Sequence, residues 1–273
     1  MWEDRQLDAL TNIAIEAGAE ILSVYNQAGP ASVTTKADDS PLTDADRRAH
    51  DLIQKRLNSL TPDWPVLSEE SDQIAYETRR RWDRYWLVDP LDGTKEFLKR
   101  NGEFTVNIAL IEHGCAVAGV VHVPVTGVSY IGKLGLGAWK LEGKQCSAIR
   151  TSSLEPGKTP VRIVASRSHR GELLDRLIGV IESEFGSVEV VSMGSSLKMC
   201  LLAEGKADIY PRLAPTCEWD TAAAHAVLAA AGGDIVDTKF EPLRYNQKSE
   251  LLNPHFLALA DCSYPWQRLL NTH

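Results

Sequence analysis

Hydrophobic positions near the start of the chain recur with the spacing of an α-helix. Apolar side chains follow one another in helical steps from Leu7 to Leu22 and again from Ala49 to Leu57. A loop that contains Gly29, Pro30 and Pro41 separates the two stretches. The pattern predicts two amphipathic helices at the beginning of the fold.

The pattern then changes to continuous apolar runs that are rich in β-branched and aromatic residues. These runs are Tyr85–Val88, Phe104–Ile111 and Ala116–Val123, with turn residues between them. Such runs predict a mostly antiparallel sheet. Gly132, Gly135 and Gly137 lie among short strand-like pieces, and their spacing does not match the G-x-G-x-x-G pattern of dinucleotide-binding loops. Hairpin turns are therefore expected there.

Strands and helices alternate after a polar stretch at Thr151–Thr159. The expected strands are residues 161–165, 188–191, 208–210 and 256–260, and the expected helices are residues 172–185, 196–204 and 220–231. Alternation of this kind is typical of an α/β arrangement. We therefore expect an N-terminal α+β half, residues 1–150, and a C-terminal α/β half, residues 151–273, which share an interface.

Composition agrees with one domain or two closely packed domains. The chain has 273 residues, of which 44% are hydrophobic and 24% are charged, as in ordinary globular proteins. Its formal net charge is −8 and its basic residues are scattered, so we expect no long nucleic acid as a partner. An anionic substrate would have to be met locally, by metal ions, helix N-termini or a few Lys and Arg residues.

The five cysteines lie far apart and form no C-x-x-C pair. This usage argues against a disulfide framework and against a zinc site, and it favours a reducing cytoplasm. The N-terminus lacks a basic region followed by an apolar run, and no stretch is apolar enough to span a membrane. We expect a cytoplasmic protein without membrane insertion. Peripheral attachment to the cytoplasmic face of the inner membrane and assembly into a homo-oligomer stay open.

The segment richest in chemistry is Trp86–Thr94, where an apolar strand runs into two carboxylates, a glycine and a hydroxyl. Asp89 and Asp92 can converge on one point, because a strand end is a rigid mount and Pro90 stiffens the turn between them. Gly93 allows a phosphate to approach the backbone where the next helix begins. Hard oxygen ligands of this kind suit Mg²⁺. Taken alone, the segment is equally typical of a turn with an Asp N-cap.

Three other acidic segments are individually ambiguous. Glu69, next to Glu70, could add a carboxylate, but acidic pairs are usually solvated surface. Asp220 stands at the start of an Ala-rich helix, where Asp is also a common N-cap. For Asp46 the plain interpretation is a helix start capped by Thr43, with acidic residues near the positive end of the helix dipole.

In combination, four motifs resemble the inositol monophosphatase superfamily of metal-dependent, lithium-sensitive phosphatases. They are Ser40-Pro41-x-Thr43-x-x-Asp46, Ser68-Glu69-Glu70-Ser71, Asp89-Pro90-Leu91-Asp92-Gly93-Thr94 and Trp219-Asp220-Thr221-Ala222-Ala223, in this order. Other residues resemble the CysQ-type 3′(2′),5′-bisphosphate nucleotidases within that superfamily. They are Leu91, Lys95-Glu96-Phe97, Asn101-Gly102-Glu103-Phe104-Thr105 and Gly194-Ser195-Ser196-Leu197-Lys198.

The resemblance implies a fold and an activity. The fold is a layered α-β-α-β-α sandwich of the inositol monophosphatase and fructose-1,6-bisphosphatase type, with a metal cleft between the two halves. The activity is that of a Mg²⁺-dependent phosphoric monoester hydrolase, which removes the 3′-phosphate of adenosine 3′,5′-bisphosphate to leave AMP and so supports sulfate assimilation. Phosphoadenylyl sulfate is a further candidate substrate. Two or three Mg²⁺ ions per site and inhibition by lithium are expected.

The resemblance also implies roles for the metal ligands. Glu69, Asp89 and the Leu91 carbonyl would hold the metal that activates water. Asp89, Asp92 and Asp220 would hold the metal that faces the leaving oxygen. Two metals about 3.5 to 4 Å apart can activate a water and neutralise a leaving group in an in-line displacement, so these roles make chemical sense.

The remaining implied roles concern water and substrate. Thr94, paired with Asp46, would orient the water, and the amides of Gly93 and Thr94 would receive the phosphate. Glu69, Leu91, Asp92 and Asp220 would also face the substrate. The other implied substrate contacts are Ser166, His169, Ser195, Lys198 and Arg212, of which Lys198 and Arg212 suit the second phosphate.

Two alternatives remain at this level. An inositol monophosphatase or a related sugar-phosphate phosphatase would use the same metal chemistry with a different pocket. A non-catalytic nucleotide or metal sensor would keep the fold with a decayed site, but the intact carboxylates and Thr94 speak against it.

Overall fold

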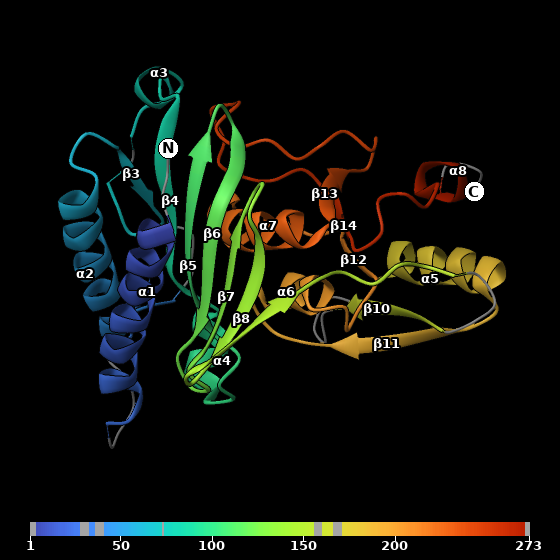
Figure 1. Ribbon diagram of the computed structural model, residues 1–273, viewed down its shortest axis with the longest axis horizontal. Helices are drawn as coiled ribbons and strands as arrows, with labels where there is room; N and C mark the ends of the chain where they lie inside the picture. The colour runs from blue at the N-terminus through green and yellow to red at the C-terminus, as the bar shows by residue number, and fades with distance from the viewer. Residues whose placement is uncertain are drawn as a thin grey trace.

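The computed structural model describes residues 4–27, 33–35, 41–72, 74–155, 160–165 and 171–270. Within these ranges the elements stack in layers of helices, sheet, helices, sheet and helices (Figure 1). Among the helices formed by the described residues, none combines the length and the apolar character that crossing a bilayer would need.

The larger sheet has seven strands in the order β3-β4-β5-β6-β7-β8-β9. Their bounds are β3 (Val66–Ser68), β4 (Arg84–Asp92), β5 (Thr105–Glu112), β6 (Cys115–Val123), β7 (Val128–Lys133), β8 (Gly137–Glu142) and β9 (Gln145–Ile149). β3 runs parallel to β4, and each later neighbour is antiparallel. The predicted antiparallel sheet is therefore confirmed.

Helices α1 (Asp4–Tyr25) and α2 (Asp44–Leu60) cover the outer face of the larger sheet (Figure 1). A short two-stranded sheet, β1 (Val33–Thr35) with β2 (Pro41–Thr43), precedes α2. The short helices α3 (Tyr76–Arg79) and α4 (Thr94–Lys99) stand before and after β4 in the chain.

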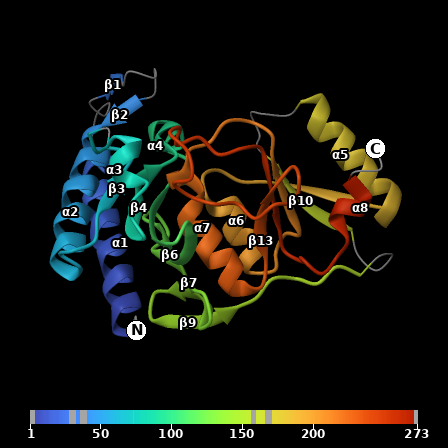
Figure 2. The same ribbon diagram turned by 90° about the horizontal axis from the view of Figure 1, so that it is seen from above.

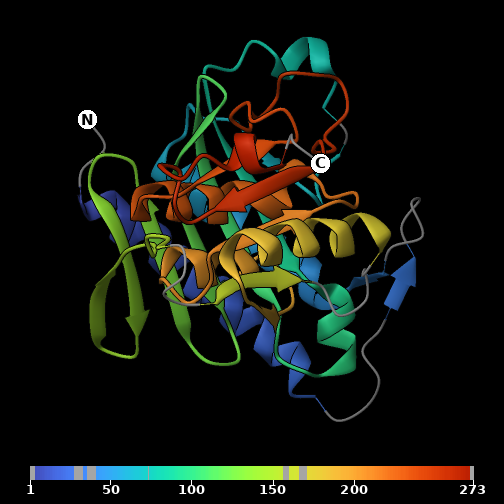
Figure 3. The same cartoon turned by 90° about the vertical axis from the view of Figure 1, so that its right-hand side faces the viewer.

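The smaller sheet has five strands in the order β11-β10-β12-β14-β13. Their bounds are β10 (Val161–Ala165), β11 (Val188–Ser192), β12 (Ile209–Arg212), β13 (Asp234–Asp237) and β14 (Phe256–Leu259). Helices α6 (Leu197–Ala203) and α7 (Glu218–Ala231) lie between the two sheets. Helices α5 (Glu172–Phe185) and α8 (Trp266–Leu270) pack on the far face, as Figure 3 shows for α5.

Alternating side chains of the central strands serve two different cores. In β4, Trp86 and Val88 pack with α1 and α2, whereas Tyr85 and Leu87 pack on the side of α6 and α7. This division follows from the twofold side-chain period of a strand. A third cluster, which includes Ile163, lies between the smaller sheet and α5 with α8. The three clusters fill the spaces between successive layers.

Helix α7 approaches the larger sheet at backbone distance (Figure 2). A Cβ atom at Gly119 of β6 would lie 2.4 Å from the Ala223 carbonyl oxygen, and one at Gly132 of β7 would lie 2.5 Å from the Val227 Cα. Real Cβ atoms do not come so close, so only glycine fits at these two strand positions. The alanine-rich sequence of α7 permits the same approach from the other side.

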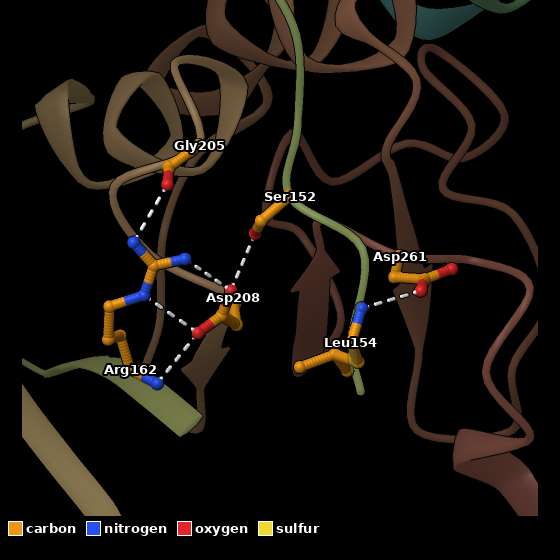
Figure 4. A network of polar contacts seen from close by, with 6 residues as sticks. All are labelled: Ser152, Leu154, Arg162, Gly205, Asp208 and Asp261. Carbon is orange, nitrogen blue, oxygen red and sulfur yellow. Dashed lines mark hydrogen bonds and ion pairs between the residues drawn. The ribbon is translucent and has the colours of Figure 1, made fainter. Parts of the chain in front are cut away.

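The connection between the two sheets is held by Asp208 (Figure 4). Asp208 accepts hydrogen bonds from the Ser152 hydroxyl at 2.5 Å, from the Arg162 amide at 2.8 Å and from the Arg162 guanidinium at 2.7 and 2.9 Å. Burial raises the pKa of Asp208, but these hydrogen bonds outweigh burial and keep it below its ordinary value. The Leu154 amide donates to Asp261 at 2.9 Å, so the connecting segment is fixed at two points.

The predicted layered sandwich is confirmed, and α5 has the predicted bounds. The smaller sheet departs from a purely parallel α/β pattern, because β14 runs antiparallel to β12 and β13. β13 was not predicted. It is a short strand that begins directly after Gly232 and Gly233, which the sequence analysis treated only as the end of a helix. Gly132 lies inside β7 rather than in a turn, whereas Gly135 does turn the chain between β7 and β8 with φ of 81°.

Candidate active site

Two carboxylates share the end of β4. Asp89 and Asp92 are three residues apart, so a regular strand would point them to opposite faces of the sheet. The pairing with β5 shifts between them, and Pro90 within this bulge has no amide hydrogen to give to the ladder. The bulge re-aims the end of the strand, and the two carboxylates act on each other electrostatically.

Glu69 is placed beside Asp89 by the parallel pairing of β3 with β4. Its amide donates to the Val88 carbonyl at 3.1 Å, just beyond the last pair of the register, Ser68 with Val88. The Ser68 hydroxyl contacts His50 Nδ1 of α2 at 2.9 Å, which fixes the end of β3. Glu69 is half-buried, and its charge acts on Asp89.

Asp220 comes from the first turn of α7. The N-cap of this helix is Cys217, and Asp220 occupies the third helical position of a capping box. Its Oδ2 atom accepts a hydrogen bond from the Cys217 amide at 2.9 Å. The expected N-cap role for Asp220 is wrong in position, because the helix begins at Glu218, but the side chain does cap the helix.

Burial raises the pKa values of the three aspartates Asp89, Asp92 and Asp220. Burial raises the pKa of Asp89 well above its ordinary value, and Glu69 and two neighbouring aspartates raise it further. Burial, with Asp92 and Glu69, raises the pKa of Asp220 to about 8. Burial also raises the pKa of Asp92, against the opposing charge of Lys198. These mutual effects place the four carboxylates in one group.

The donor set suits a hard divalent cation. Carboxylate and carbonyl oxygens are the ligands that Mg²⁺ prefers, and a positive charge among them would offset the burial and the repulsion that raise the pKa values of Asp89 and Asp220. In the ranges that the structure describes, no set of three or more His, Cys, Asp or Glu side chains already stands in an arrangement that could hold a metal ion.

Thr94, the first residue of α4, points its hydroxyl toward Asp46 of α2. Its Oγ1 atom lies 3.5 Å from Asp46 Oδ1 and 3.4 Å from the Leu91 carbonyl oxygen. Gly93 is the N-cap of α4 with φ of 94°, a conformation that favours glycine. A Cβ atom at Gly93 would also lie 3.2 Å from the Glu103 carbonyl oxygen. The left-handed conformation of Gly93 thus allows Thr94 to lie next to Asp46.

A cavity of about 620 Å³ opens beside these residues. Six of the predicted site residues line it, namely Asp92, Gly93, Ser195, Lys198, Arg212 and Asp220. Tyr210 and Phe256 line it as well, and their rings meet edge to face with centroids 5.8 Å apart. The cavity therefore has both charged and aromatic surface and draws on both halves of the chain.

Lys198 is the buried cation of this cavity. It is 7% exposed, and its Nζ atom donates to the Ser195 carbonyl at 2.9 Å and lies 5.6 Å from the centre of the Tyr210 ring. Burial lowers the pKa of Lys198, and the charge of Asp92 opposes this effect. A buried ammonium beside open space can receive an anionic group.

The other predicted substrate contacts differ in how far the structure describes them. Arg212 donates to the carbonyls of Ala214 and Pro215 at 3.1 and 3.0 Å, which orients its guanidinium. Ser195 has φ of 42°, and its buried Oγ atom has no hydrogen-bond partner within the described residues. Ser166 and His169 lie outside the described residues.

The sequence model of the inositol monophosphatase family matches residues 2–266. The chain belongs to the inositol monophosphatase family. A curated relative, the 3'(2'),5'-bisphosphate nucleotidase CysQ of Escherichia coli O157:H7, is 49% identical over 250 residues, which cover 92% of this chain and 98% of that protein. A protein of the same description from Haemophilus influenzae is 36% identical over 263 residues, which cover 96% of each chain.

Solved structures agree with this family assignment. The crystal structure of CysQ from Bacteroides thetaiotaomicron, a bacterial member of the inositol monophosphatase family, has a TM-score of 0.83 and 44% sequence identity, and the match covers 95% of this chain and 98% of that one. The SuhB protein of Bartonella henselae, at 24% identity and a TM-score of 0.77, shares the fold. The predicted inositol monophosphatase type of fold is confirmed.

Three polar residues of this family member lie next to Asp92 and were not assigned a role from the sequence. They are Thr105 and Asn107 of β5 and Ser196 just before α6, all 2% exposed or less. The signal for Asn107 was present, because a polar residue interrupts an otherwise apolar strand that is buried along its length. The contact between Asn107 and Ser196 could not be predicted from the sequence, because 89 residues separate them.

Proposed function

We propose that the chain is a Mg²⁺-dependent 3′(2′),5′-bisphosphate nucleotidase that hydrolyses the 3′-phosphate of adenosine 3′,5′-bisphosphate to AMP and phosphate. The observation that carries the proposal is a single cavity in which the carboxylates Asp92 and Asp220 face the cations Lys198 and Arg212. A substrate with two separated phosphates fits this division of charge. The description of the relatives as CysQ-type bisphosphate nucleotidases supports the same substrate class.

Five groups would hold the metal ions in this proposal, namely Glu69, Asp89, the Leu91 carbonyl, Asp92 and Asp220. The raised pKa values of Asp89, Asp92 and Asp220 show that burial and nearby charge disfavour their ionised forms, a cost that a bound cation would offset. Bound Mg²⁺ would supply charge stabilisation and lower the pKa of an attacking water. Two or three ions and inhibition by lithium belong to the proposal.

The protein's own groups would orient the reactants. Asp46 accepts from Thr94, so the Thr94 hydroxyl oxygen is left to accept a hydrogen bond from the attacking water, which fixes the direction of attack. The amides of Gly93 and Thr94 would bind the reacting phosphate. Lys198 and Arg212 would bind the second phosphate, and this second contact holds the substrate in register with the carboxylates.

Two features stay predictions that follow from this function. Phosphoadenylyl sulfate resembles the bisphosphate and would enter the same cavity. A cytoplasmic location would supply both Mg²⁺ and the by-products of sulfate activation.

The decisive experiment measures phosphate release from adenosine 3′,5′-bisphosphate and from inositol 1-phosphate, each with Mg²⁺, with a chelator and with added lithium. We expect turnover of the bisphosphate that needs Mg²⁺ and declines with lithium. Preference for inositol 1-phosphate would replace the proposal with a sugar-phosphate phosphatase. Binding of either ligand without turnover would support the sensor alternative.

A further inference from the structure

A buried hydrogen-bond network joins the two halves of the chain directly behind Asp92. Thr105 and Asn107 enter it from β5 of the larger sheet, and Ser196 enters it from the turn before α6. The Ser196 Oγ atom lies 2.9 Å from Asn107 Oδ1 and 2.9 Å from Thr105 Oγ1. Asp92 Oδ2 accepts from the Ser196 amide at 2.6 Å.

The chemistry of these groups fixes the direction of each hydrogen bond. An amide oxygen cannot donate, so the Ser196 hydroxyl gives its only proton to Asn107 Oδ1. The Thr105 hydroxyl must then be the donor in its contact with Ser196. With its oxygen held by Ser196, the Asn107 side chain turns its NH₂ group toward Asp92 Oδ2, at 3.5 Å.

Both donors meet the same oxygen of Asp92. The Ser196 amide and the Asn107 NH₂ group converge on Oδ2, and among the described residues no hydrogen bond is formed to Oδ1. Both printed contacts therefore hold the carboxylate through its Oδ2 atom.

The same turn carries substrate-binding groups. Ser195 adopts φ of 42°, which is uncommon for a residue with a side chain, and its carbonyl accepts from Lys198 Nζ at 2.9 Å. A Cβ atom at Gly194 would lie 2.8 Å from Glu103 Oε2, so the turn also sits tightly against the N-terminal half. The turn whose Ser195 carbonyl holds Lys198 Nζ is thus the same turn whose Ser196 amide donates to Asp92.

We propose that Ser196, Asn107 and Thr105 are positioning residues that orient Asp92 and couple the substrate-binding turn to it. The Ser196 hydroxyl sets which end of the Asn107 amide faces the carboxylate. Without it the amide can turn over and present its oxygen to Asp92, which repels the carboxylate from its position. This inference rests on the proposed function only for the identity of the reaction.

The test compares Ser196→Ala and Thr105→Val with Ser129→Ala. Ser129 is a fully buried hydroxyl that contacts His122 Nδ1 at 2.9 Å, away from the cavity, so it reports the effect of losing a buried hydroxyl alone. Two quantities are measured for each variant: kcat and KM with adenosine 3′,5′-bisphosphate, and the Mg²⁺ affinity of the substrate-free protein by calorimetric titration.

We expect Ser196→Ala to lower kcat and Mg²⁺ affinity about 10- to 100-fold, as changes beside metal ligands do, with KM changed by less than about threefold. Thr105→Val should have a smaller effect in both measurements, because the Ser196 hydroxyl still donates to Asn107. Thr105→Ser keeps the donor and should restore the wild-type values. If Ser196→Ala does not fold, Ser196→Cys keeps the shape of the side chain with a weaker donor and should show the same losses in reduced form.

The inference is overturned if the Ser196 variants match Ser129→Ala in both kcat and Mg²⁺ affinity, since the network would then only join the two halves. It is also overturned if Thr105→Val is more damaging than Ser196→Ala, because the direction of the bonds would be wrong. A wild-type protein that does not hydrolyse the bisphosphate would refute the proposed function, and the Mg²⁺ titration would still decide the inference.

Discussion

Thr94 Oγ1 lies 3.5 Å from Asp46 Oδ1, although 48 residues separate them in the chain. Asp46 has a second function, because its Oδ2 atom accepts from the amide and the hydroxyl of Thr43 at 2.8 and 2.6 Å. Thr43 is the N-cap of α2, as the sequence predicted. The Asp46 carboxylate therefore takes part in the cap of α2 through Oδ2 and faces the Thr94 hydroxyl, the candidate water-orienting group, through Oδ1.

Asp46→Asn should separate these two functions. The amide oxygen of Asn can still accept from Thr43, whereas its NH₂ group would face Thr94 and can no longer accept the hydroxyl proton. We expect kcat to fall by about 100-fold or more, in the range of lost proton-transfer assistance, with a small change in melting temperature. Thr94→Ser keeps the hydroxyl and serves as the control. Wild-type kcat in Asp46→Asn would exclude the pair from catalysis.

Lys198→Ala should weaken binding of the second phosphate. We expect KM for adenosine 3′,5′-bisphosphate to rise about 10- to 100-fold, the amount of a lost charge-assisted contact, while kinetics with any monophosphate substrate change far less. Lys198→Met fills the same space without charge and controls for lost packing. Equal effects on both substrates would show that Lys198 acts on the metal site instead.

Metal removal should destabilise the protein, because the grouped carboxylates repel one another. We expect Mg²⁺ to raise the melting temperature of the stripped protein, by an amount that corresponds to about 2.7 kcal/mol at a concentration 100 times Kd. Asp220→Asn should stabilise the stripped protein and reduce the Mg²⁺ shift. Asp51→Asn removes an exposed carboxylate of α2 and should change neither quantity. An undiminished shift in Asp220→Asn would remove this residue from the ligand set.

Gly119→Ala tests the close contact of α7 with the larger sheet. The added Cβ atom would meet the Ala223 carbonyl oxygen, so the helix or the strand must move, which costs roughly 1 to 3 kcal/mol of unfolding free energy. Gly179→Ala in α5 meets no atom within 4 Å and should be neutral or stabilising by up to about 1 kcal/mol. Denaturant unfolding measures both, and equal stabilities would contradict the packing argument.

His122 should make the protein less stable in acid. Burial lowers the pKa of His122 to about 4, against 6.5 for an ordinary histidine. Between pH 6.5 and pH 4, His122 stays neutral in the folded protein but takes up a proton in the unfolded chain. Its contribution is therefore complete above pH 6.5, declines as pH falls, and levels off near pH 4. We expect the difference in unfolding free energy between wild type and His122→Gln to follow this course, with a span of at most about 3 kcal/mol. A pH-independent difference would refute it.

Most of the elements could be predicted from the sequence because each depends on local periodicity, whereas the layer order followed from the resemblance to the family. The apolar run of β4 before Asp89, the N-cap Thr43 and the C-cap Gly232 all carry such local signals. The family motifs then brought together Glu69, Asp92 and Asp220, which no local pattern could do.

Contacts between distant segments could not be predicted in this way. Nothing in the sequence near Ser196 shows that its amide meets Asp92 across the interface between the halves. The need for glycine at position 119 was also not predictable. It arises from Ala223, which is 104 residues later in the chain and whose backbone occupies the space that a side chain at position 119 would need. Such features belong to packing rather than to propensity.

Helix α7 lies between the two sheets, and this position determines when the candidate site can form during folding. Asp220 reaches the other carboxylates only after α7 has settled on the larger sheet, and the cavity closes only after the smaller sheet has covered α7. Loop-closure entropy delays such long-range contacts relative to local helices. Catalytic competence should therefore return after secondary structure when the protein refolds, and Mg²⁺ would then bind as a late event that locks the assembled layers.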